Sequence, residues 1–310
     1  MEYVLLLVGF ALLIKGADFF VDGASSIARS LKIPSIVIGL TLVSMGTSAP
    51  EAAVSITAGL SGNSDIALGN VIGSNIFNLL AVIGCAALLR FVPSPSSIIK
   101  RDLPINIGIT LLLILFMIDG SIGRINGLIL FAGIVLYMIF LVRDSMKNRV
   151  EETPDKEIMP VLKSIFFVVA GLTAVIIGGQ LVVNNASTIA RSLGMSNTLV
   201  GLTIVAIGTS LPELVTSVIA AKKGDSGIAL GNAVGSCIFN VLFILGSASI
   251  LTPIHVDPTL LIDAGILIAA SIIILIFSKT EKQVNRKEGI FCILAYVAYS
   301  AYIIMRGMGA

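Results

Sequence analysis

The chain has 310 residues, of which 56% are hydrophobic and only 12% are charged. Soluble proteins carry about 25% charged residues, so this composition, with a mean hydropathy of +1.04, excludes a soluble globular protein and predicts a membrane-embedded one. The net charge of +2 says little about partners, and we expect no nucleic-acid partner.

About ten stretches are apolar enough to cross a bilayer, which needs about 20 mostly apolar residues. In chain order they are 3–22, 34–58, 66–89, 103–119, 124–142, 161–183, 197–220, 228–251, 259–277 and 288–305. The charged stretch from Arg143 to Glu157 is the one linker. We therefore predict an all-α membrane protein with a first five-helix repeat over residues 1–143, a cytoplasmic linker over 144–159 and a second five-helix repeat over 160–310.

One stretch of sequence occurs twice, 162 residues apart. The segment GLTLVSMGTSAPE, Gly39–Glu51, returns as GLTIVAIGTSLPE at 201–213. The same offset relates ALGN at 67–70 to 229–232 and GSNIFN at 73–78 to GSCIFN at 235–240. An odd number of helices per half inserts the second half upside down, which predicts the inverted repeat found in many secondary transporters.

The basic residues predict the orientation of these helices. If the N-terminus lies outside, 16 of the 20 Lys and Arg residues fall in cytoplasmic loops and three on the external side. Cytoplasmic loops of membrane proteins carry such an excess of basic residues. We expect an integral protein of the plasma membrane, surrounded by lipid, with both termini outside.

Two carboxylates lie in the middle of predicted spans, Glu51 and Glu213. Insertion of a charged side chain at the bilayer centre costs about 2.5–3.5 kcal/mol of free energy or more, so a carboxylate there indicates either an ion-pair partner or a function. The alternative is a glutamate that pairs with a basic residue or stays protonated against a neighbouring helix. Lys15 is the one basic residue near this depth, and it can instead pair with Asp18, three residues further along the helix.

A proline precedes each glutamate, at Pro50 and Pro212. A proline inside a helix removes one hydrogen bond, and the nearby Gly46 and Gly208 make a local break easier. Backbone carbonyls freed at membrane depth are tolerated where they line a cavity. An ordinary proline kink is the alternative, but the recurrence of Gly-Thr-Ser-x-Pro-Glu favours a polar site.

Hydroxyl and amide side chains accompany the glutamates in both copies. They are Thr47, Ser48, Ser74 and Asn78 in the first copy and Thr209, Ser210, Ser236 and Asn240 in the second. A single serine within a membrane usually packs helices together. Together, however, these residues offer only oxygen ligands, which suit calcium, sodium or magnesium rather than zinc or copper.

Both copies resemble the α-repeats of the calcium/cation antiporter superfamily, specifically its sodium/calcium exchanger branch. The resemblance implies a ten-helix fold with ion sites at mid-membrane, no cofactor, and Ca²⁺ and Na⁺ as transported ions. It implies that Glu51 and Glu213 bridge the central calcium site and that the first and sixth helices slide to open it. It implies the following ligands: the backbone carbonyls of Ser44 and Ala206, and the side chains of Thr47, Ser48, Glu51, Ser74, Asn78, Thr209, Ser210, Glu213, Ser236 and Asn240.

One position departs from some members of this superfamily. Potassium-dependent exchangers carry an aspartate where this chain has Asn240, which argues against potassium co-transport. The proton-coupled branch typically has Gly-Asn-x-x-Glu at the glutamates, and this chain does not.

Four functions therefore compete. We predict a sodium/calcium antiporter for which one chain is a sufficient functional unit. The alternative is a proton-coupled calcium or divalent-cation antiporter, because burial favours protonated carboxyl groups. A cation channel is disfavoured by the inverted repeat with its paired midplane carboxylates. We expect no enzymatic activity, because the chain offers no pairing of a nucleophile with a base and no metal-binding histidines.

Overall fold

Long helices account for most of the chain in the computed structural model, which describes residues 1–147, 158–195, 200, 204 and 206–307. The first half contains helices α1 (Glu2–Ser30), α2 (Ser35–Ile38), η1 (Gly39–Val43), α3 (Ser44–Thr47), α4 (Ala49–Leu60), α5 (Ser64–Phe77), η2 (Asn78–Val82), α6 (Ile83–Leu89), η3 (Ile98–Asp102), α7 (Leu103–Ile118) and α8 (Arg124–Lys147). The second half contains α9 (Val161–Ser192), α11 (Ala206–Gly208), α12 (Leu211–Lys223), α13 (Ser226–Phe239), η5 (Asn240–Leu245), α14 (Gly246–Leu251), α15 (Leu260–Thr280) and α16 (Arg286–Gly307). The segments labelled η are π-helical.

The all-α membrane fold is confirmed. Within the described residues, eight helices are long and apolar enough to cross a membrane. The two halves of a ninth span, Ser35–Thr47 and Ala49–Leu60, meet at an angle of 50°. The expected span 197–220 lies partly outside the described residues, and its described part includes α11 and α12. The count of ten therefore stays a prediction.

The described helices recur at the same offset as the sequence motif. Helix α5 and helix α13 start 162 residues apart, and so do the short strands β1 (Val92–Pro93) and β3 (Ile254–His255). Strand β1 pairs with β4 (Gln283–Val284), and β3 pairs with β2 (Ser121–Ile122), in two antiparallel pairs. Each pair joins one half of the chain to the other. The sequence did not predict these strands, which are only two residues long and lie in connections between spans.

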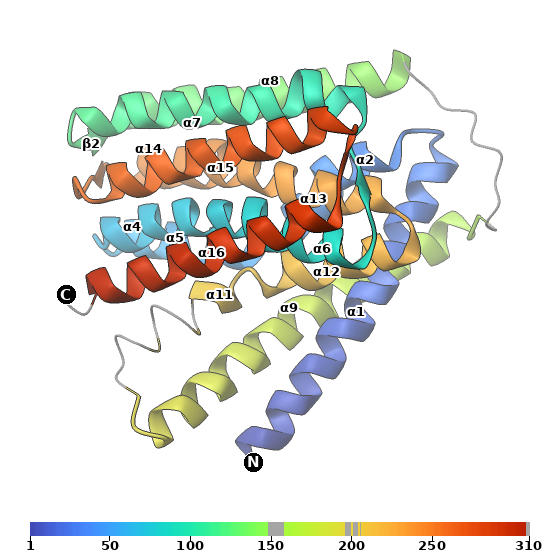
Figure 1. Cartoon of the computed structure of the whole chain (residues 1–310), viewed down its shortest axis with the longest axis horizontal. Coiled ribbons are helices and arrows are strands. Elements are labelled where there is room, and N and C mark those ends of the chain that lie inside the picture. Colours follow the sequence, from blue (N-terminus) through green and yellow to red (C-terminus); the bar gives the residue numbers. More distant parts are fainter. Residues whose placement is uncertain (148–157, 196–199, 201–203, 205, 308–310) are drawn as a thin grey trace.

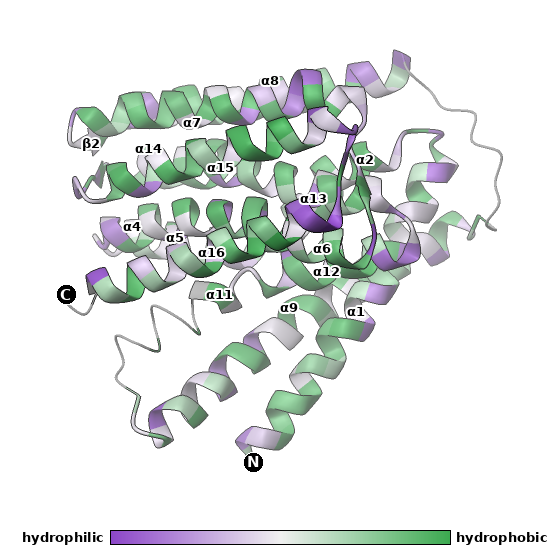
Figure 2. Cartoon of the chain, in the orientation of Figure 1, coloured by the Kyte–Doolittle hydropathy of each residue, from purple (hydrophilic) through white to green (hydrophobic). Residues whose placement is uncertain are grey.

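The central spans are those that contain α5 and α13. In these two spans, 83% and 78% of the apolar window is buried inside the protein, against 11–39% for the other six. Figure 2 shows hydrophobic residues along most helices, including the outer ones. The outer helices therefore present apolar side chains to lipid, as a bilayer requires, while α5 and α13 form the protein's interior.

Helices α1 and α9 pack against each other and lie obliquely to the stack of the other long helices (Figure 1). Glycines allow this contact: a Cβ on Gly16 would lie 2.8 Å from Val175 N, and a Cβ on Gly171 would lie 2.5 Å from Phe20 N. Small residues let helix backbones approach closely within membranes. Both helices continue past the predicted apolar stretches. They run antiparallel, so the polar end of α1 packs against the start of α9, where Ser26 Oγ accepts a 2.9 Å hydrogen bond from Ser164 Oγ.

Ion pairs attach outer helices to their neighbours. Helix α1 is joined to α12 by Lys223 Nζ, which lies 2.6 Å from Asp18 Oδ1 and 2.7 Å from Asp22 Oδ1. The expected pairing of Asp18 with Lys15 is therefore wrong, because a lysine at the end of another helix reaches both aspartates of α1. Such a contact between distant parts of the chain has no signature in helical spacing.

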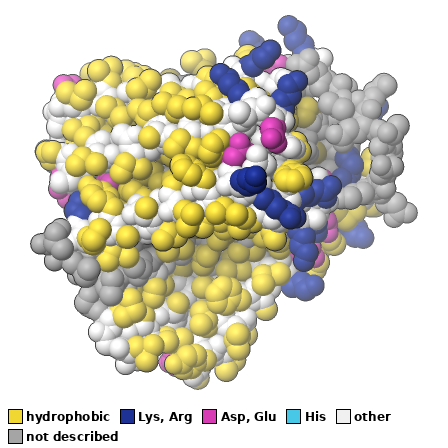
Figure 3. Space-filling model, viewed as in Figure 1, with side chains coloured by type: hydrophobic (Ala, Val, Ile, Leu, Met, Phe, Trp, Pro, Cys, Tyr) yellow, Lys and Arg dark blue, Asp and Glu magenta, His cyan; other side chains and the backbone are white. Residues whose placement is uncertain are grey.

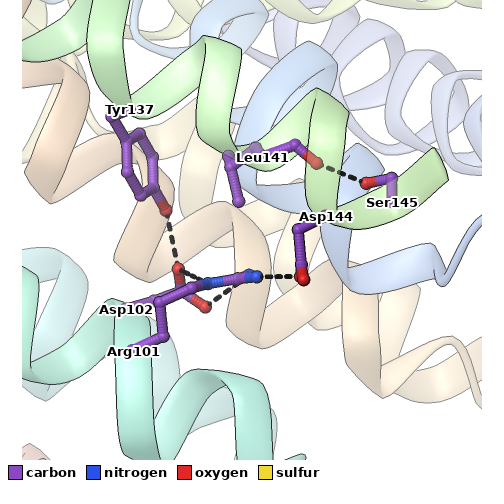
Figure 4. Close-up of polar contacts among 6 residues, drawn as sticks. All are labelled: Arg101, Asp102, Tyr137, Leu141, Asp144 and Ser145. Carbon is purple, nitrogen blue, oxygen red and sulfur yellow. Dashed lines mark hydrogen bonds and ion pairs between the residues drawn. The ribbon is translucent and has the colours of Figure 1, made fainter. Parts of the chain in front are cut away.

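A second polar cluster fastens η3, which leads directly into α7, to α8 (Figure 4). The Arg101 guanidinium binds Asp102 at 2.8 and 3.0 Å and also pairs with Asp144. Tyr137 donates a 3.0 Å hydrogen bond to the buried Asp102 carboxylate. Because every charge in the cluster has a partner, burial of Asp102 is compensated.

A corresponding ion pair links α15 to α16. Arg306 lies 2.7 Å from Asp263, and Asp144 and Arg306 are 162 residues apart. The last two helices of each half therefore correspond in their polar anchors as well as in hydropathy.

The α1–α9 contact predicts a position-dependent response to the same substitution. Gly171→Ala should lower the free energy of unfolding by about 1–3 kcal/mol, because the new methyl group overpacks a backbone contact. Gly108→Ala on α7 is the matched control, since a Cβ there meets no atom within 4 Å. It should be neutral or gain about 0.5–1 kcal/mol from helix propensity. Thermal melting of the purified protein in detergent measures both, and equal melting temperatures would contradict the close packing.

Candidate ion-binding site

Two helices begin at corresponding serines in the middle of the protein. The expected span 34–58 is interrupted at Ser48, and α12 begins directly after Ser210. Pro50 and Pro212 lie at the second positions of α4 and α12. Proline is accepted in the first turn of a helix because the N–H that it lacks would have no partner there. The prolines therefore start new helices, and the interior position predicted for them is wrong.

Each new helix carries one of the two glutamates in its first turn. Glu51 and Glu213 are both completely buried. The first turn exposes unpaired backbone N–H groups and carries a partial positive charge, which stabilises a nearby carboxylate. The break in each span thus places a carboxylate where the backbone itself offsets part of its burial cost.

The two glutamates are held by serines of the opposite half. Ser48 Oγ donates a 2.9 Å hydrogen bond to Glu213 Oε1, and Ser210 Oγ donates a 2.8 Å hydrogen bond to Glu51 Oε1. The carboxylates also lie close enough to interact electrostatically. This reciprocal serine–glutamate contact brings the duplicated motifs together in space.

Several polar atoms around this contact have no hydrogen-bond partner among the described residues. They are Glu51 Oε2, Glu213 Oε2, Ser236 Oγ, Asn240 Oδ1, and both Oδ1 and Nδ2 of Asn78. A buried polar atom without a partner costs about 1–3 kcal/mol, and more if it is charged. Most of these atoms are oxygens, so a cation bound among them would recover that cost.

The cations that fit this set are hard ones. Within the part of the chain that the structure describes, no three His, Cys, Asp or Glu side chains gather into a cluster. Most ligands must then come from hydroxyl and amide oxygens, with two carboxylates. Such donors suit Ca²⁺ or Na⁺, and calcium accepts six to eight oxygens in flexible geometry.

The other residues expected at the site lie at different distances from the glutamates, and some also contact groups outside the expected set. Ser74 Oγ is 3.2 Å from Ser210 Oγ, and Thr209 lies near the Glu51 carboxylate. Thr47 is buried and contacts Asn232 Oδ1 at 3.0 Å, so its hydroxyl also meets a group outside the expected set. The Ser44 carbonyl accepts the N–H of Ser48 at 3.0 Å, and Ala206 begins α11. These contacts place the residues without assigning ligand roles to them.

Two asparagines behind the glutamates were missed by the sequence reasoning. Asn70 Nδ2 donates to Ser55 Oγ at 2.9 Å and to the Glu51 carbonyl at 3.4 Å. Asn232 makes the same two contacts with Ser217 and the Glu213 carbonyl, at 2.9 and 3.3 Å. The available signal was the recurrence of Ala-Leu-Gly-Asn at the 162-residue offset. Each asparagine supports the helix turn from which a glutamate projects.

A cavity of about 380 Å³ extends from this region between α5, α15 and α16. Its lining includes Ser74 and Thr209, and also Asp65, Asp263 and Arg306. Asp65 and Ser74 are nine residues apart on α5, so the cavity follows that helix for about 13 Å. It therefore joins the surroundings of the glutamates to the end of the protein at which α5 and α15 begin.

Comparison with known proteins identifies the family. The family model described as sodium/calcium exchanger protein matches residues 1–143 and 163–305. The chain belongs to the sodium/calcium exchanger family. The resemblance of its duplicated motif to that family is confirmed, and the family transports Na⁺ and Ca²⁺ without a cofactor.

Relatives match the chain over nearly its whole length. CaxA of Alkalimonas amylolytica is 42% identical over 309 residues, covering 96% of each chain. The sodium/calcium exchanger MaX1 of Methanosarcina acetivorans is 34% identical over 339 residues, covering 96% of this chain and 97% of the relative. A solved structure of the sodium-calcium exchanger NCX_Mj, soaked with Na⁺ and Ca²⁺, superposes with a TM-score of 0.86 at 30% identity, covering 97% of both chains.

The cavity has room for a side chain at Gly73. Gly73 lines it, and a Cβ there meets no atom within 4 Å. Leucine at this position should fill the passage and slow calcium uptake into proteoliposomes by at least about tenfold, which corresponds to ~1.4 kcal/mol of added barrier.

Gly265→Leu is the matched control, because Gly265 also has no neighbour within 4 Å but is exposed on α15, outside the cavity. Uptake that is unchanged in Gly73→Leu would exclude the cavity as the route to the site.

Proposed function

We propose that this protein is a sodium/calcium antiporter that exchanges several Na⁺ for one Ca²⁺ at a midplane site centred on Glu51 and Glu213. One observation carries the proposal. Each buried glutamate uses one carboxylate oxygen to accept a serine hydrogen bond from the opposite half, and its other oxygen has no partner among the described residues. Two such oxygens, from two neighbouring carboxylates, match the charge of one calcium ion.

The proposed ligands are the twelve residues expected from the duplicated motif. The two carboxylates would bind Ca²⁺ directly, while hydroxyl and amide oxygens complete its shell. They are Ser44, Thr47, Ser48, Glu51, Ser74 and Asn78 in the first half and Ala206, Thr209, Ser210, Glu213, Ser236 and Asn240 in the second, with Ser44 and Ala206 acting through their backbone carbonyls. The unpartnered oxygens of Asn78, Ser236 and Asn240 support this assignment most directly.

Exchange follows from competition for the same carboxylates. Sodium ions and Ca²⁺ cannot both neutralise Glu51 and Glu213, so binding of several Na⁺ expels Ca²⁺ and the reverse. If three Na⁺ replace one Ca²⁺, one net charge crosses the membrane in each cycle. A membrane potential of 100 mV acts on that charge with about 2.3 kcal/mol.

Alternating access requires a part that moves as a unit. We assign this role to α1 and α9, whose glycine-mediated backbone contacts bind them tightly to each other. Sliding of this pair across the remaining helices would close the cavity beside α5 and open the opposite side. All proposed ligands come from one chain, so a monomer is a sufficient unit of transport.

The proposed organisation and orientation follow the charge pattern. Residues 1–143 and 160–310 would be inverted repeats joined by a cytoplasmic linker over 144–159, with both termini outside the plasma membrane. Figure 3 supports this orientation, because Lys and Arg side chains gather toward the end of the visible face at which α1 and α8 finish. Basic residues concentrate on the cytoplasmic side of membrane proteins.

Proton coupling is the second candidate. It is favoured by the complete burial of both glutamates and by the lack of an ion pair to either one among the described residues. A proton on each carboxylate would also neutralise the site, and its release would then drive calcium binding.

Uptake of radioactive calcium by proteoliposomes distinguishes the two. Sodium-loaded vesicles diluted into sodium-free buffer should accumulate calcium, and vesicles with equal sodium on both sides should not.

Glu51→Gln and Glu213→Gln should each reduce calcium affinity about 100-fold or more, because removal of one partner from a buried charge pair costs about 3–5 kcal/mol. Glu281→Gln, in an exposed connection, is the matched control. Uptake that follows a pH gradient and ignores sodium would overturn sodium coupling in favour of proton coupling.

A further inference from the structure

The two halves of the candidate site differ where the two most buried helices, α5 and α13, meet. Asn75 in α5 and Cys237 in α13 are 162 residues apart, and both are completely buried. Each side chain reaches the backbone of the other: Asn75 Nδ2 donates to the Cys237 carbonyl at 3.1 Å, and Cys237 Sγ donates to the Asn75 carbonyl at 3.6 Å. The two helices therefore meet at this pair with matching geometry but different side chains.

The Cys237 carbonyl fixes which way the Asn75 amide faces. A backbone carbonyl only accepts hydrogen bonds, so the end of Asn75 that meets it must be the NH₂ group. Asn75 Oδ1 then faces Asn240 and accepts a 3.0 Å hydrogen bond from Asn240 Nδ2. This second bond fixes the Asn240 amide in turn, and its Oδ1 is left without a hydrogen-bond partner among the described residues.

The corresponding chain is missing in the other half. Asn78 corresponds to Asn240, and both residues begin π-helical segments, η2 and η5. Neither the oxygen nor the nitrogen of the Asn78 amide has a partner among the described residues. The thiol of Cys237 is a weak donor and offers no amide oxygen that could hold the Asn78 NH₂ group.

We propose that Asn75 is a positioning residue that fixes the side-chain oxygen Oδ1 of Asn240 for cation binding, and that Cys237 leaves the side-chain amide of Asn78 free to rotate. The inference rests on the proposed function of Asn78 and Asn240 as ligands. It gives the site one fixed amide oxygen and one adjustable amide. An adjustable ligand lets one cavity hold either a single Ca²⁺ or several Na⁺, whose oxygen shells have different shapes.

Exchange of the two side chains tests this directly. Asn75→Cys should raise the KM for calcium about tenfold with little change in maximal rate, because the Asn240 amide loses the hydrogen bond that orients it. Cys237→Asn should lower the KM by about threefold to tenfold, since the introduced asparagine would orient Asn78 as Asn75 orients Asn240. The double variant Asn75→Cys/Cys237→Asn keeps both side chains but exchanges their positions, so it should return the KM to within about threefold of the wild-type value. Cys237→Ala keeps the backbone carbonyl and should leave the KM unchanged.

Sodium-driven calcium uptake by proteoliposomes of all five proteins provides the KM and the maximal rate. A structural role alone would lower the maximal rate, or the yield of folded protein, in Asn75→Cys without raising the KM, and the double variant would not restore it. Either result would overturn the inference, while restored affinity in the double variant would support it. If Asn75→Cys does not fold, Cys237→Asn decides, because an unchanged KM there also overturns it. A wild-type protein without sodium-driven uptake would refute the proposed function itself.

Discussion

The reciprocal hydrogen bonds between Ser48 and Glu213 and between Ser210 and Glu51 are the contact on which the rest of the site depends. Each glutamate is buried at the start of a helix in one half and receives its hydrogen bond from the serine that starts a helix in the other. Neither half can complete this arrangement alone. The repeat is therefore a physical requirement of the site, because each copy supplies a carboxylate that only the other copy can hold.

The surrounding structure stabilises two nearby negative charges in a low-dielectric interior. Helix starts direct backbone N–H groups toward the carboxylates, and Asn70 and Asn232 hold the turns from which they project. The most buried spans, which contain α5 and α13, carry the unpartnered oxygens of Asn78, Ser236 and Asn240, and the two asparagines begin π-helical segments. π-helical segments of this kind are frequent at functional sites. These supports supply only partial positive charge, and in the proposed function transported cations supply the full charges that neutralise both carboxylates.

Much of the fold, and the proximity of the two glutamates at the centre of the candidate site, could be predicted from the sequence. Apolar segment length gave the spans, and the duplicated Gly-Thr-Ser-x-Pro-Glu gave the paired carboxylates. The helix starts at Ser48 and Ser210 could not be read in the same way, because a proline indicates a kink and a helix start equally well. The contacts of Lys223 with Asp18 and Asp22, and of Asn75 with Asn240, join residues more than 160 positions apart. Helical spacing carries no information about such contacts, although the 162-residue offset could have identified Asn70, Asn232 and the Asn75–Cys237 difference.

The most direct test of the account is an anomalous difference map from crystals of this protein grown with calcium, recorded at a wavelength where calcium scatters anomalously. We expect the strongest peak about 2.3–2.6 Å from carboxylate oxygens of both Glu51 and Glu213, the distance at which calcium binds oxygen. A strongest peak that contacts only one glutamate, or that lies elsewhere, such as beside Asp65 in the cavity, would contradict it.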